Sequence, residues 1–337
     1  MSRRRVSVAV LAVAAAAVAA GIAGVASAGA RSARPSAEPT VIRMGIEPWI
    51  GYGPWWIADA QGFDTQNGCD IQITNFTTDA DINSAFASGQ LDVSNIATHT
   101  GLRFIGAGLP VKVVLFEDVS TKADAILAGP GTDSVADMAG KSVAFEEGTT
   151  SDLLLRYALE QNGMSIDDVE VVPIPAADAG AAAIAGRVDV AVTYEPYLTA
   201  ALKQDPDFKL IYTAGERPGL ISDILVANAD FAQENPDALV CALKAWGQAV
   251  DFYNANTDEA QRIIAEKVGA KPEELKESFA GVELYGLDDS AEFLDTQFVE
   301  LANQIKEILK QQESLEGDPD PASVLDTSYL EQARGGG

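Results

Sequence analysis

Short apolar runs alternate with stretches of helical periodicity along much of this sequence, and few folds are compatible with that pattern. Val41–Ile46 is the first predicted strand, and Pro54–Gln61 is the first predicted helix. Further predicted strands are Cys69–Thr74, Val93–Ile96, Val111–Phe116, Ala125–Ala128, Ser142–Phe145, Val169–Ile174, Val188–Thr193 and Leu210–Tyr212. The alternation predicts an α/β fold with parallel sheets and crossover helices.

The predicted helices fall into two groups. Those between the strands are Asp79–Ser88, Thr150–Asn162, Ala177–Ala185 and Glu195–Gln204. From Pro236 onward helical periodicity takes over, with predicted helices at Leu239–Asn254, Thr257–Val268, Pro272–Ala280 and Ser290–Gln311. An α/β part is therefore followed by a helical C-terminal third.

A short internal repeat suggests that the α/β part is built from two similar lobes. Ala85–Val93 and Ala182–Val190 share the pattern A-x-x-x-G-x-x-D-V, in which a helix ends at the glycine and a strand follows. Ligands of open α/β sheets bind beyond the carboxyl ends of strands. We therefore expect Asn95–Thr100 and Thr193–Glu195, which follow the two repeated strands, to face each other across a cleft.

The first residues have the pattern of an export signal. Ser2–Arg5 is basic, Val6–Ala28 is uncharged, and Ala26–Ala28 is a small-residue cleavage site. We expect a signal over residues 1–28 and a flexible tether over residues 29–40, so that the protein is periplasmic or otherwise extracytoplasmic. The paired arginines also resemble a twin-arginine signal. An uncleaved membrane anchor is the alternative, because the apolar run approaches spanning length.

Charge and residue inventory exclude several classes of function. Asp and Glu number 50 against 23 Lys and Arg, a net charge of −27, which disfavours nucleic acid as a partner. One histidine and two cysteines cannot build a His-rich or Cys-rich zinc site, and we expect neither metal nor cofactor. Cys69 and Cys241 are compatible with a disulfide in an oxidising compartment, but two buried free thiols are the favoured interpretation.

An aromatic loop follows the first predicted strand. Glu47–Trp56 contains three of the four tryptophans, and Pro and Gly keep it from being helical before Pro54. Trp49 and Tyr52 suit an aromatic wall with polar tips over a small solute. The alternative is that the tryptophans only pack the following helix, which we favour for Trp55 and Trp56.

Polar segments follow two predicted strands of the second lobe. Thr149 and Thr150 precede a helix, where free backbone N–H groups serve either an anion or ordinary capping. Glu195 precedes Pro196 and is either a helix cap or a ligand contact. Other carboxylates at predicted strand and loop ends are Asp118, Asp124 and Glu146. Because cations are scarce there, this balance suits a cationic or amide-rich ligand better than an anion.

Nothing in the sequence requires catalysis. His99 follows a predicted strand, but no G-x-S-x-G element supplies a nucleophile for it. The sequence also lacks the phosphate-binding pattern G-x-x-x-x-G-K-[ST] and a G-x-G-x-x-G after a strand.

Several segments together resemble the substrate-binding proteins of nitrate, sulfonate and taurine ABC importers. They are the aromatic loop Trp49–Trp56, Gly62-Phe63, Ala85-x-x-x-Gly89-x-x-Asp92, Ser134–Val143 and Val190–Tyr197. The resemblance implies a type II periplasmic-binding-protein-like fold, with two lobes joined by two crossings near 128–131 and 219–224. One lobe would comprise 41–128 plus 225–330, and the other 129–224.

The resemblance also implies a function. The aromatic loop looks most like a subgroup associated with urea or guanidine use, which favours a guanidine-like cation over a sulfonate. The residues expected to contact the solute are Trp49, Tyr52, Thr98, His99, Asp118, Asp124, Glu146, Thr149, Thr150, Tyr194, Glu195 and Asp223. We expect a monomer that delivers its solute to an ABC permease, touches the membrane only through that transporter and performs no chemistry. Alternatives are a ligand sensor for a membrane receptor and a pyrimidine-synthesis-type enzyme on the same fold.

Overall fold

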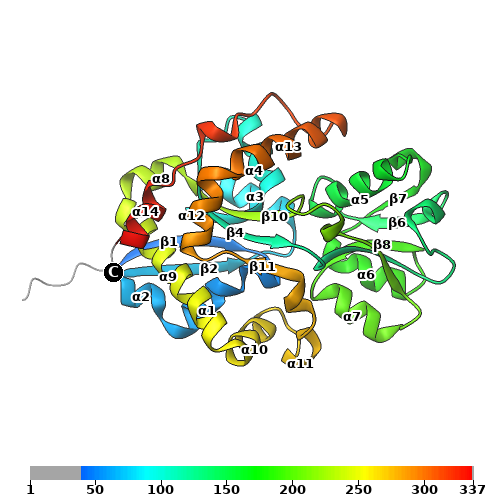
Figure 1. The fold of residues 1–337 in the computed structure, drawn as a ribbon, viewed down its shortest axis with the longest axis horizontal. Helices are drawn as coiled ribbons and strands as arrows, with labels where there is room; N and C mark the ends of the chain where they lie inside the picture. The colour runs from blue at the N-terminus through cyan, green and yellow to red at the C-terminus, as the bar shows by residue number, and fades with distance from the viewer. Residues whose placement is uncertain (1–38, 336–337) are drawn as a thin grey trace, which may run out of the picture. The chain divides into compact units, whose positions relative to one another are not determined.

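The structure, a computed structural model, describes residues 39–335 and contains two β-sheets (Figure 1). The expected signal, and the expected tether up to residue 38, lie outside the described residues. A six-stranded sheet has the order β11-β4-β10-β3-β1-β2, and a five-stranded sheet has the order β7-β6-β8-β5-β9. We call the six-stranded sheet with its packed helices the larger lobe, and the five-stranded sheet with its packed helices the smaller lobe.

The strands of the smaller sheet are consecutive along the chain and lie between two groups of strands of the larger sheet. The larger sheet contains β1 (Thr40–Ile46), β2 (Cys69–Asn75), β3 (Val93–Ala97), β4 (Val111–Ser120), β10 (Ser222–Asn228) and β11 (Val282–Leu284). The smaller sheet contains β5 (Asp124–Ala128), β6 (Ser142–Phe145), β7 (Glu170–Pro173), β8 (Val190–Tyr194) and β9 (Lys209–Thr213). The chain therefore crosses from the larger lobe after β4 and returns after β9.

The helices divide in the same way. Those of the smaller lobe are α5 (Thr150–Gln161), α6 (Ala176–Ile184) and α7 (Tyr197–Gln204). Those of the larger lobe are α1 (Gly53–Gln61), α2 (Phe63–Asn67), α3 (Asp79–Ala87), α4 (Thr98–Gly106), α8 (Ala229–Glu234), α9 (Pro236–Ala255), α10 (Thr257–Lys267), α11 (Pro272–Leu275), α12 (Leu287–Thr296), α13 (Phe298–Gln311) and α14 (Ser328–Gly335). Short 3₁₀ turns include η1 (Ile50–Tyr52) and η5 (Ser278–Gly281).

Helices cover both faces of the smaller sheet, with α5 on one side and α6 and α7 on the other (Figure 1). Along β5, Ile126 and Ala128 pack into the hydrophobic cluster that includes α5, whereas Ala125 and Leu127 pack into the cluster that includes α6 and α7. A strand buried on both faces must be apolar at every position, which explains why β5 is a continuous apolar run.

The internal repeat corresponds to equivalent positions in the two sheets, as predicted. Both of its glycines end a helix with a positive φ, 75° in the first copy and 67° in the second. The Asp92 carboxylate accepts a hydrogen bond from Arg43 N at 2.8 Å, and the Asp189 carboxylate accepts one from Ser142 N at 3.0 Å. Each aspartate thus ties the start of its strand to the neighbouring parallel strand, β1 in one lobe and β6 in the other.

The sheets are mixed, so the expectation of parallel sheets holds for β1 with β2 and β3 and for β6 with β7 and β8, but not for the other pairs. β10 is antiparallel to β3 and β4, β11 is antiparallel to β4, and β5 is antiparallel to β8 and β9. β5 and β10 are the first strands after the two crossings. Because each arrives from the other lobe rather than through a crossover helix on its own sheet, it can insert with the opposite direction.

The first crossing lies earlier in the chain than expected, and the second overlaps the expected range but ends slightly earlier. Asp124–Ala128 already belongs to the smaller sheet, so the first crossing spans 121–123, where the N–H groups of Thr121 and Lys122 donate to the carbonyl of Gly281. The second crossing ends before Ser222, which begins β10 of the larger sheet. An apolar run shows that a strand is buried without showing which sheet it joins, so the sequence misplaced these boundaries.

The predicted helix Ser290–Gln311 is two helices. Gln297 has φ −128° and separates α12 from α13. α12 packs on β4 and α14, whereas α13 packs on α4. Helical periodicity continues across the break because each helix buries an apolar stripe, although the two stripes face different neighbours.

Cys69 and Cys241 form a disulfide, so the expectation of two free thiols is wrong. Cys69 begins β2 and Cys241 lies in α9, which packs across β2 and brings the two Cα atoms to 6.1 Å. Both residues are buried, as expected. Burial is readable from the sequence, but the proximity of residues 172 positions apart is not.

Replacing both cysteines, Cys69→Ser with Cys241→Ser, should lower the free energy of unfolding by about 2–5 kcal/mol, because the bridge restricts a long loop of the unfolded chain. Urea denaturation followed by circular dichroism measures the change. Reductant added to the wild-type protein should reproduce it, and an unchanged urea midpoint would contradict a stabilising role for the bridge.

Candidate functional site

A pocket lies where the carboxyl ends of the parallel strands of both lobes meet. From the larger lobe it is lined by the segment after β1, by the end of β3, by the start of α3 and by the start of β10. From the smaller lobe it is lined by the start of β5, the end of β8 and the first residues of α5 and α6. This is the arrangement expected for ligand sites in open α/β sheets.

The pocket is small and combines expected and unexpected residues. About 40 Å³ is open to the centre of a water molecule, enough for a few heavy atoms. Of the residues expected to contact a solute, Trp49, Tyr52, Asp124, Thr149, Thr150, Tyr194 and Asp223 line it. Residues that line it but were not named as solute contacts are Glu47, Asp79, Ile82, Asn95, Ile96, Ala97, Ser151, Ala176 and Ile221, of which Asn95, Ile96 and Ala97 belong to a segment expected to face the cleft.

Aromatic side chains from both lobes form one wall. The rings of Trp49 and Tyr194 lie edge to face, with centroids 6.0 Å apart. Trp49 Nε1 donates to Asp118 at 3.2 Å, and Tyr52 donates to Asp223 at 2.9 Å. A Cβ at Gly51 would collide with Trp49 and Asp118, so this close approach requires glycine.

Trp55 and Trp56 do not line the pocket. Both are buried in the core of the larger lobe, and Trp55 packs on Trp246 of α9 with ring centroids 5.0 Å apart. Trp55 Nε1 also donates to the buried Glu117 carboxylate at 2.8 Å. The packing interpretation therefore holds for these two tryptophans.

Four carboxyl groups line the pocket, those of Glu47, Asp79, Asp124 and Asp223. Burial, reinforced by Glu146 and Asp223, raises the pKa of Asp79 to about 7. Burial likewise raises the pKa of Asp124 to about 7 and that of Asp223 to about 6. Burial and neighbouring carboxylates raise the pKa of Glu47 well above its ordinary range. Each group therefore favours a proton or a bound cation over an isolated negative charge.

Positive side chains do not balance these acids at the pocket wall. Among residues 39–335, none of the side chains that line the pocket belongs to Lys or Arg. Two more acids, Glu117 and Asp118, are fully buried behind the wall. Burial is the main cause that raises the pKa of each well above its usual range.

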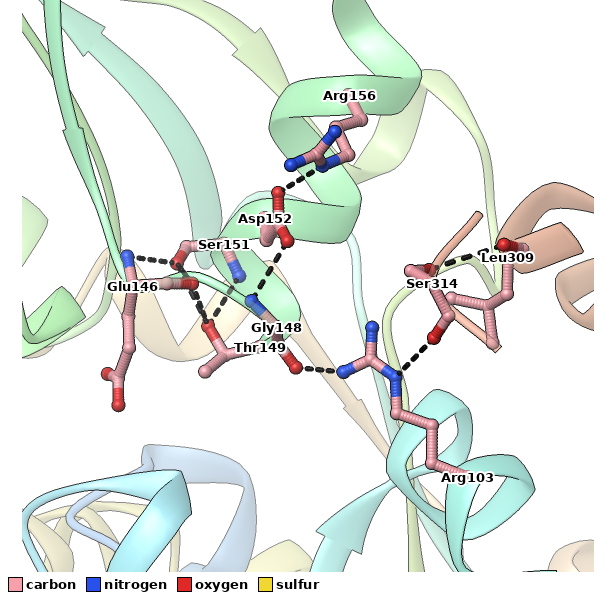
Figure 2. Close-up of polar contacts among 9 residues, drawn as sticks. All are labelled: Arg103, Glu146, Gly148, Thr149, Ser151, Asp152, Arg156, Leu309 and Ser314. Carbon is pink, nitrogen blue, oxygen red and sulfur yellow. Dashed lines mark hydrogen bonds and ion pairs between the residues drawn. The ribbon is translucent and has the colours of Figure 1, made fainter. Parts of the chain in front are cut away.

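The loop between β6 and α5 uses most of its own hydrogen-bond donors (Figure 2). The Glu146 carbonyl accepts from the hydroxyls of Thr149 and Ser151, at 2.8 and 3.2 Å. Ser151 N donates to Thr149 Oγ1, and Gly148 N donates to Asp152 at 2.9 Å. The hydroxyl-rich start of α5 is thus largely a self-capped turn, and Asp152 adds a negative charge beside it.

Arg103 joins the two lobes beside this loop. It extends from α4 of the larger lobe and donates to the Gly148 carbonyl of the smaller lobe and to the Ser314 carbonyl at 3.1 Å (Figure 2). A second contact between the lobes involves the hydroxyls of Thr199 in α7 and Ser278 in η5, which lie 2.8 Å apart. The lobes therefore make direct polar contacts outside the pocket.

A further contact between lobes is the ion pair of Lys203 in α7 with Glu274 in α11, at 3.5 Å. Together with the ring contact of Trp49 and Tyr194, these interactions describe lobes closed against each other.

Five expected residues lie outside the pocket lining. They are Thr98, His99, Asp118, Glu146 and Glu195. Glu195 accepts from Thr199 N at 3.1 Å and Thr199 Oγ1 at 2.9 Å, which matches the capping alternative. Glu146 accepts from Ala176 N at 3.0 Å, at the start of α6. Their contacts are with the protein, so a role toward solute remains a prediction.

The other three residues stand behind the pocket wall. Thr98 lies 2.9 Å from the Ser222 hydroxyl, and Asp118 accepts from Trp49. His99 is buried in the first turn of α4, and burial lowers its pKa well below its usual value, so its imidazole is neutral.

The sequence carried signals for some of the unexpected residues. Glu47 directly follows β1 and opens the aromatic loop, and Asp79 is the first residue of α3. Asn95 lies inside the apolar strand β3, where a buried amide is itself unusual. A polar residue interrupting an apolar strand near its carboxyl end was therefore a readable sign of the pocket.

The described part of the chain offers neither a metal centre nor a membrane span. Within residues 39–335, no group of three or more His, Cys, Asp or Glu side chains is arranged to hold a metal ion. Over the same residues, no helix is both long and apolar enough to cross a bilayer.

Comparisons with known proteins identify relatives of this chain. The model of the NMT1/THI5-like family matches residues 49–260. A protein of Brucella abortus (strain 2308), named as a binding protein, is 28% identical over 227 residues, which are 66% of this chain and 70% of that protein. The taurine-binding periplasmic protein of Escherichia coli K12 is 24% identical over 196 residues, covering 58% of this chain and 61% of that protein.

A solved structure has the same fold. The alkanesulfonate-binding protein of Xanthomonas axonopodis pv. citri, bound to MOPS, aligns with a TM-score of 0.74 and 21% identity, over 86% of this chain and 99% of that chain. The two-lobed α/β fold of periplasmic-binding-protein type is thereby confirmed, as is the resemblance to sulfonate- and taurine-binding proteins.

Replacing Arg103 with methionine should shift the lobes toward an open arrangement, because the variant loses the donors that reach Gly148 and Ser314. Hydrogen bonds from a charged group contribute about 1.5–3 kcal/mol, so the open population should rise about tenfold or more. Small-angle X-ray scattering measures the change in radius of gyration. Arg156→Met is the matched control, since Arg156 pairs with Asp152 within α5; equal effects of the two variants would contradict a role between lobes.

Proposed function

The chain belongs to the NMT1/THI5-like family, and we propose that it is the solute-binding component of an ABC importer for a small nitrogen-rich solute, a guanidine-like cation in preference to a sulfonate. The observation that carries the ligand class is the pocket wall, where Glu47, Asp79, Asp124 and Asp223 gather without a lysine or arginine among the lining residues described. A cation inside this wall replaces protons as the partner of the carboxylates.

A sulfonate meets unfavourable chemistry in the same pocket. Its three oxygens need donors, whereas the hydroxyls of Tyr52 and Thr149 and the indole of Trp49 already donate to protein acceptors. The start of α5 is one remaining place for an anion, and the Asp152 carboxylate lies beside it. Relatives of this chain that bind sulfonates or taurine therefore support the importer role without supporting the same ligand.

The two lobes suggest how binding is signalled. Trp49, Tyr52 and Asp223 approach the solute from the larger lobe, and Asp124, Thr150 and Tyr194 approach it from the smaller lobe. A solute that contacts both lobes favours the closed arrangement, and a permease that recognises this arrangement receives only loaded protein. The low dielectric of a closed cleft strengthens each polar contact within it.

The disulfide supports export, because such bonds persist in oxidising compartments outside the cytoplasm. We infer that residues 1–28 direct the chain there, and that it works as a monomer touching the membrane only through its transporter. The relatives reported above are named as binding proteins, and the single histidine is buried outside the pocket lining, so an enzyme is the weaker proposal.

A thermal-shift screen of residues 29–337 tests the ligand class with guanidinium, urea, nitrate, taurine and alkyl sulfonates. Guanidinium should raise the melting temperature by several degrees, because a ligand at 100 times its Kd adds about 2.7 kcal/mol of stability. Asp223→Asn should abolish the shift, whereas Asp258→Asn, the same charge change at an exposed site in α10, should preserve it. A shift with a sulfonate and none with guanidinium would overturn the proposal.

The affinity for a guanidinium probe should rise from pH 5 to pH 8. The pKa of Asp79 and of Asp124 is about 7 and that of Asp223 about 6 in the free protein, so protons compete with a cation below these values. One unit of pKa corresponds to 1.36 kcal/mol, so the affinity should change about tenfold or more. Calorimetric titrations in buffers of different ionisation enthalpy should also show proton release.

The stability of the free protein should respond to pH in the opposite direction. Carboxyl groups whose pKa is raised in the folded state contribute stability that is present below their unfolded pKa and is lost as the pH rises through the folded value.

For the affinity prediction, a guanidinium affinity that is flat between pH 5 and pH 8 would contradict the role of these carboxylates.

A further inference from the structure

Two buried acceptor atoms that line the pocket have no hydrogen-bond partner among the described residues. They are Asn95 Oδ1 and Asp124 Oδ2, on side chains that are 2% and 6% exposed. Asn95 belongs to β3 of the larger lobe, and Asp124 begins β5 of the smaller lobe. Native proteins rarely leave such atoms unpaired, so a ligand that supplies donors is the expected partner.

The orientation of the Asn95 amide is determined by its other end. Asn95 Nδ2 donates to the carbonyl of Gly45 at 2.7 Å, on the neighbouring strand β1. Rotating the amide by half a turn would place its oxygen against that carbonyl. The amide oxygen, and not the nitrogen, is therefore the group of Asn95 that is left without a partner beside the pocket.

Asp124 is likewise free to accept. The Ser120 hydroxyl lies close enough to Asp124 to lower its pKa, but neither Ser120 Oγ nor Asp124 Oδ2 forms a complete hydrogen bond among the described residues, so Asp124 can accept from a further donor. Asp223 and Asp79 line the same pocket, and neither carboxylate can donate when ionised. The donors of Trp49 and Tyr52 are engaged elsewhere, as described above.

We propose that Asn95 and Asp124 form a clasp between the lobes, in which each accepts one N–H from a planar cation that carries N–H groups on at least two nitrogens, the guanidinium or amidinium class. This inference rests on the proposed function and assigns a ligand contact to Asn95. A planar cation of this class directs N–H groups to opposite sides and has no acceptor that needs a donor. A quaternary ammonium has no N–H, and urea needs a donor for its carbonyl.

The clasp also links binding to closure. When the lobes are apart, a solute bound to Asn95 has a second N–H group that cannot reach the Asp124 acceptor. A solute bound to Asp124 likewise cannot reach the Asn95 acceptor. Both acceptors are satisfied together only in the closed arrangement, and a ligand shifts a conformational equilibrium through such differential contacts.

Isothermal titration of guanidinium chloride and methylammonium chloride into wild-type protein and variants tests the clasp. Asn95→Ala and Asp124→Asn should each weaken guanidinium binding at least tenfold. Asn83→Ala is the matched control, because Asn83 Oδ1 is also buried and unpaired but Asn83 does not line the pocket; its affinity should stay within twofold of wild type. Methylammonium, which has a single nitrogen, should lose far less affinity than guanidinium in Asn95→Ala.

The outcomes separate this inference from the proposed function. No binding of guanidinium to the wild-type protein would overturn the proposed function and the clasp with it. Binding by the wild type with unchanged affinity in both variants would overturn the clasp alone. Asn95→Ala also loses the hydrogen bond to Gly45, so a crystal structure of the wild-type protein with guanidinium is the second test. Guanidinium nitrogens within about 3.2 Å of both acceptors support the clasp. A solute that lies beyond about 4 Å from either acceptor overturns it.

Discussion

The pocket of this protein depends on carboxyl groups of like charge that are held close together away from bulk water. Buried acids in proteins are usually paired with a cation. Here Asp223 receives a hydrogen bond from Tyr52, and Asp118 receives one from Trp49, but no basic side chain joins them in the described lining. Raised pKa values follow from this arrangement, so protons stabilise the empty site and a cationic solute can take their place.

The fold brings these groups together by building two lobes on one local plan. In each, a helix ends at a glycine and an aspartate ties the next strand to its parallel neighbour, Asp92 in one lobe and Asp189 in the other. The plan points the carboxyl ends of both sets of strands toward the same cleft. The polar contacts between the lobes, such as Arg103 on Gly148 and Lys203 on Glu274, lie outside the pocket lining.

The elements of the fold were largely predictable from the sequence, because periodicity reports which face of a segment is buried. β6 has the bounds expected from its apolar run, and α3 and α5 differ from expectation by one residue. Information that depends on distant neighbours was not predictable. The apolar run of β5 does not show which sheet it joins, and burial of Cys69 and Cys241 does not show that they meet.

The candidate site was predicted less well than the fold, for a related reason. Residue type and position after a strand identified Trp49 and Tyr52, but they do not show where a side chain points. Glu195 meets those criteria and instead turns to Thr199 in the next helix. Asn95 belongs to the segment expected to face the cleft, but it was not named as a solute contact, because it lies within a strand and its acceptor is left free only by the bond to Gly45.

Arg103 contributes to closure without lining the acidic pocket. Burial lowers the pKa of its guanidinium and the Asp152 and Asp79 carboxylates oppose that change, yet its hydrogen bonds go to the backbone carbonyls of Gly148 and Ser314. Those carbonyls hold the arginine at the rim, so its charge does not occupy the site. The pocket carboxylates therefore remain available to a solute, while the Arg103 guanidinium joins the lobes. Substitutions at the rim therefore change how firmly the lobes close without altering the groups that line the pocket, whereas substitutions in the pocket alter both the choice of solute and the closure that the solute favours.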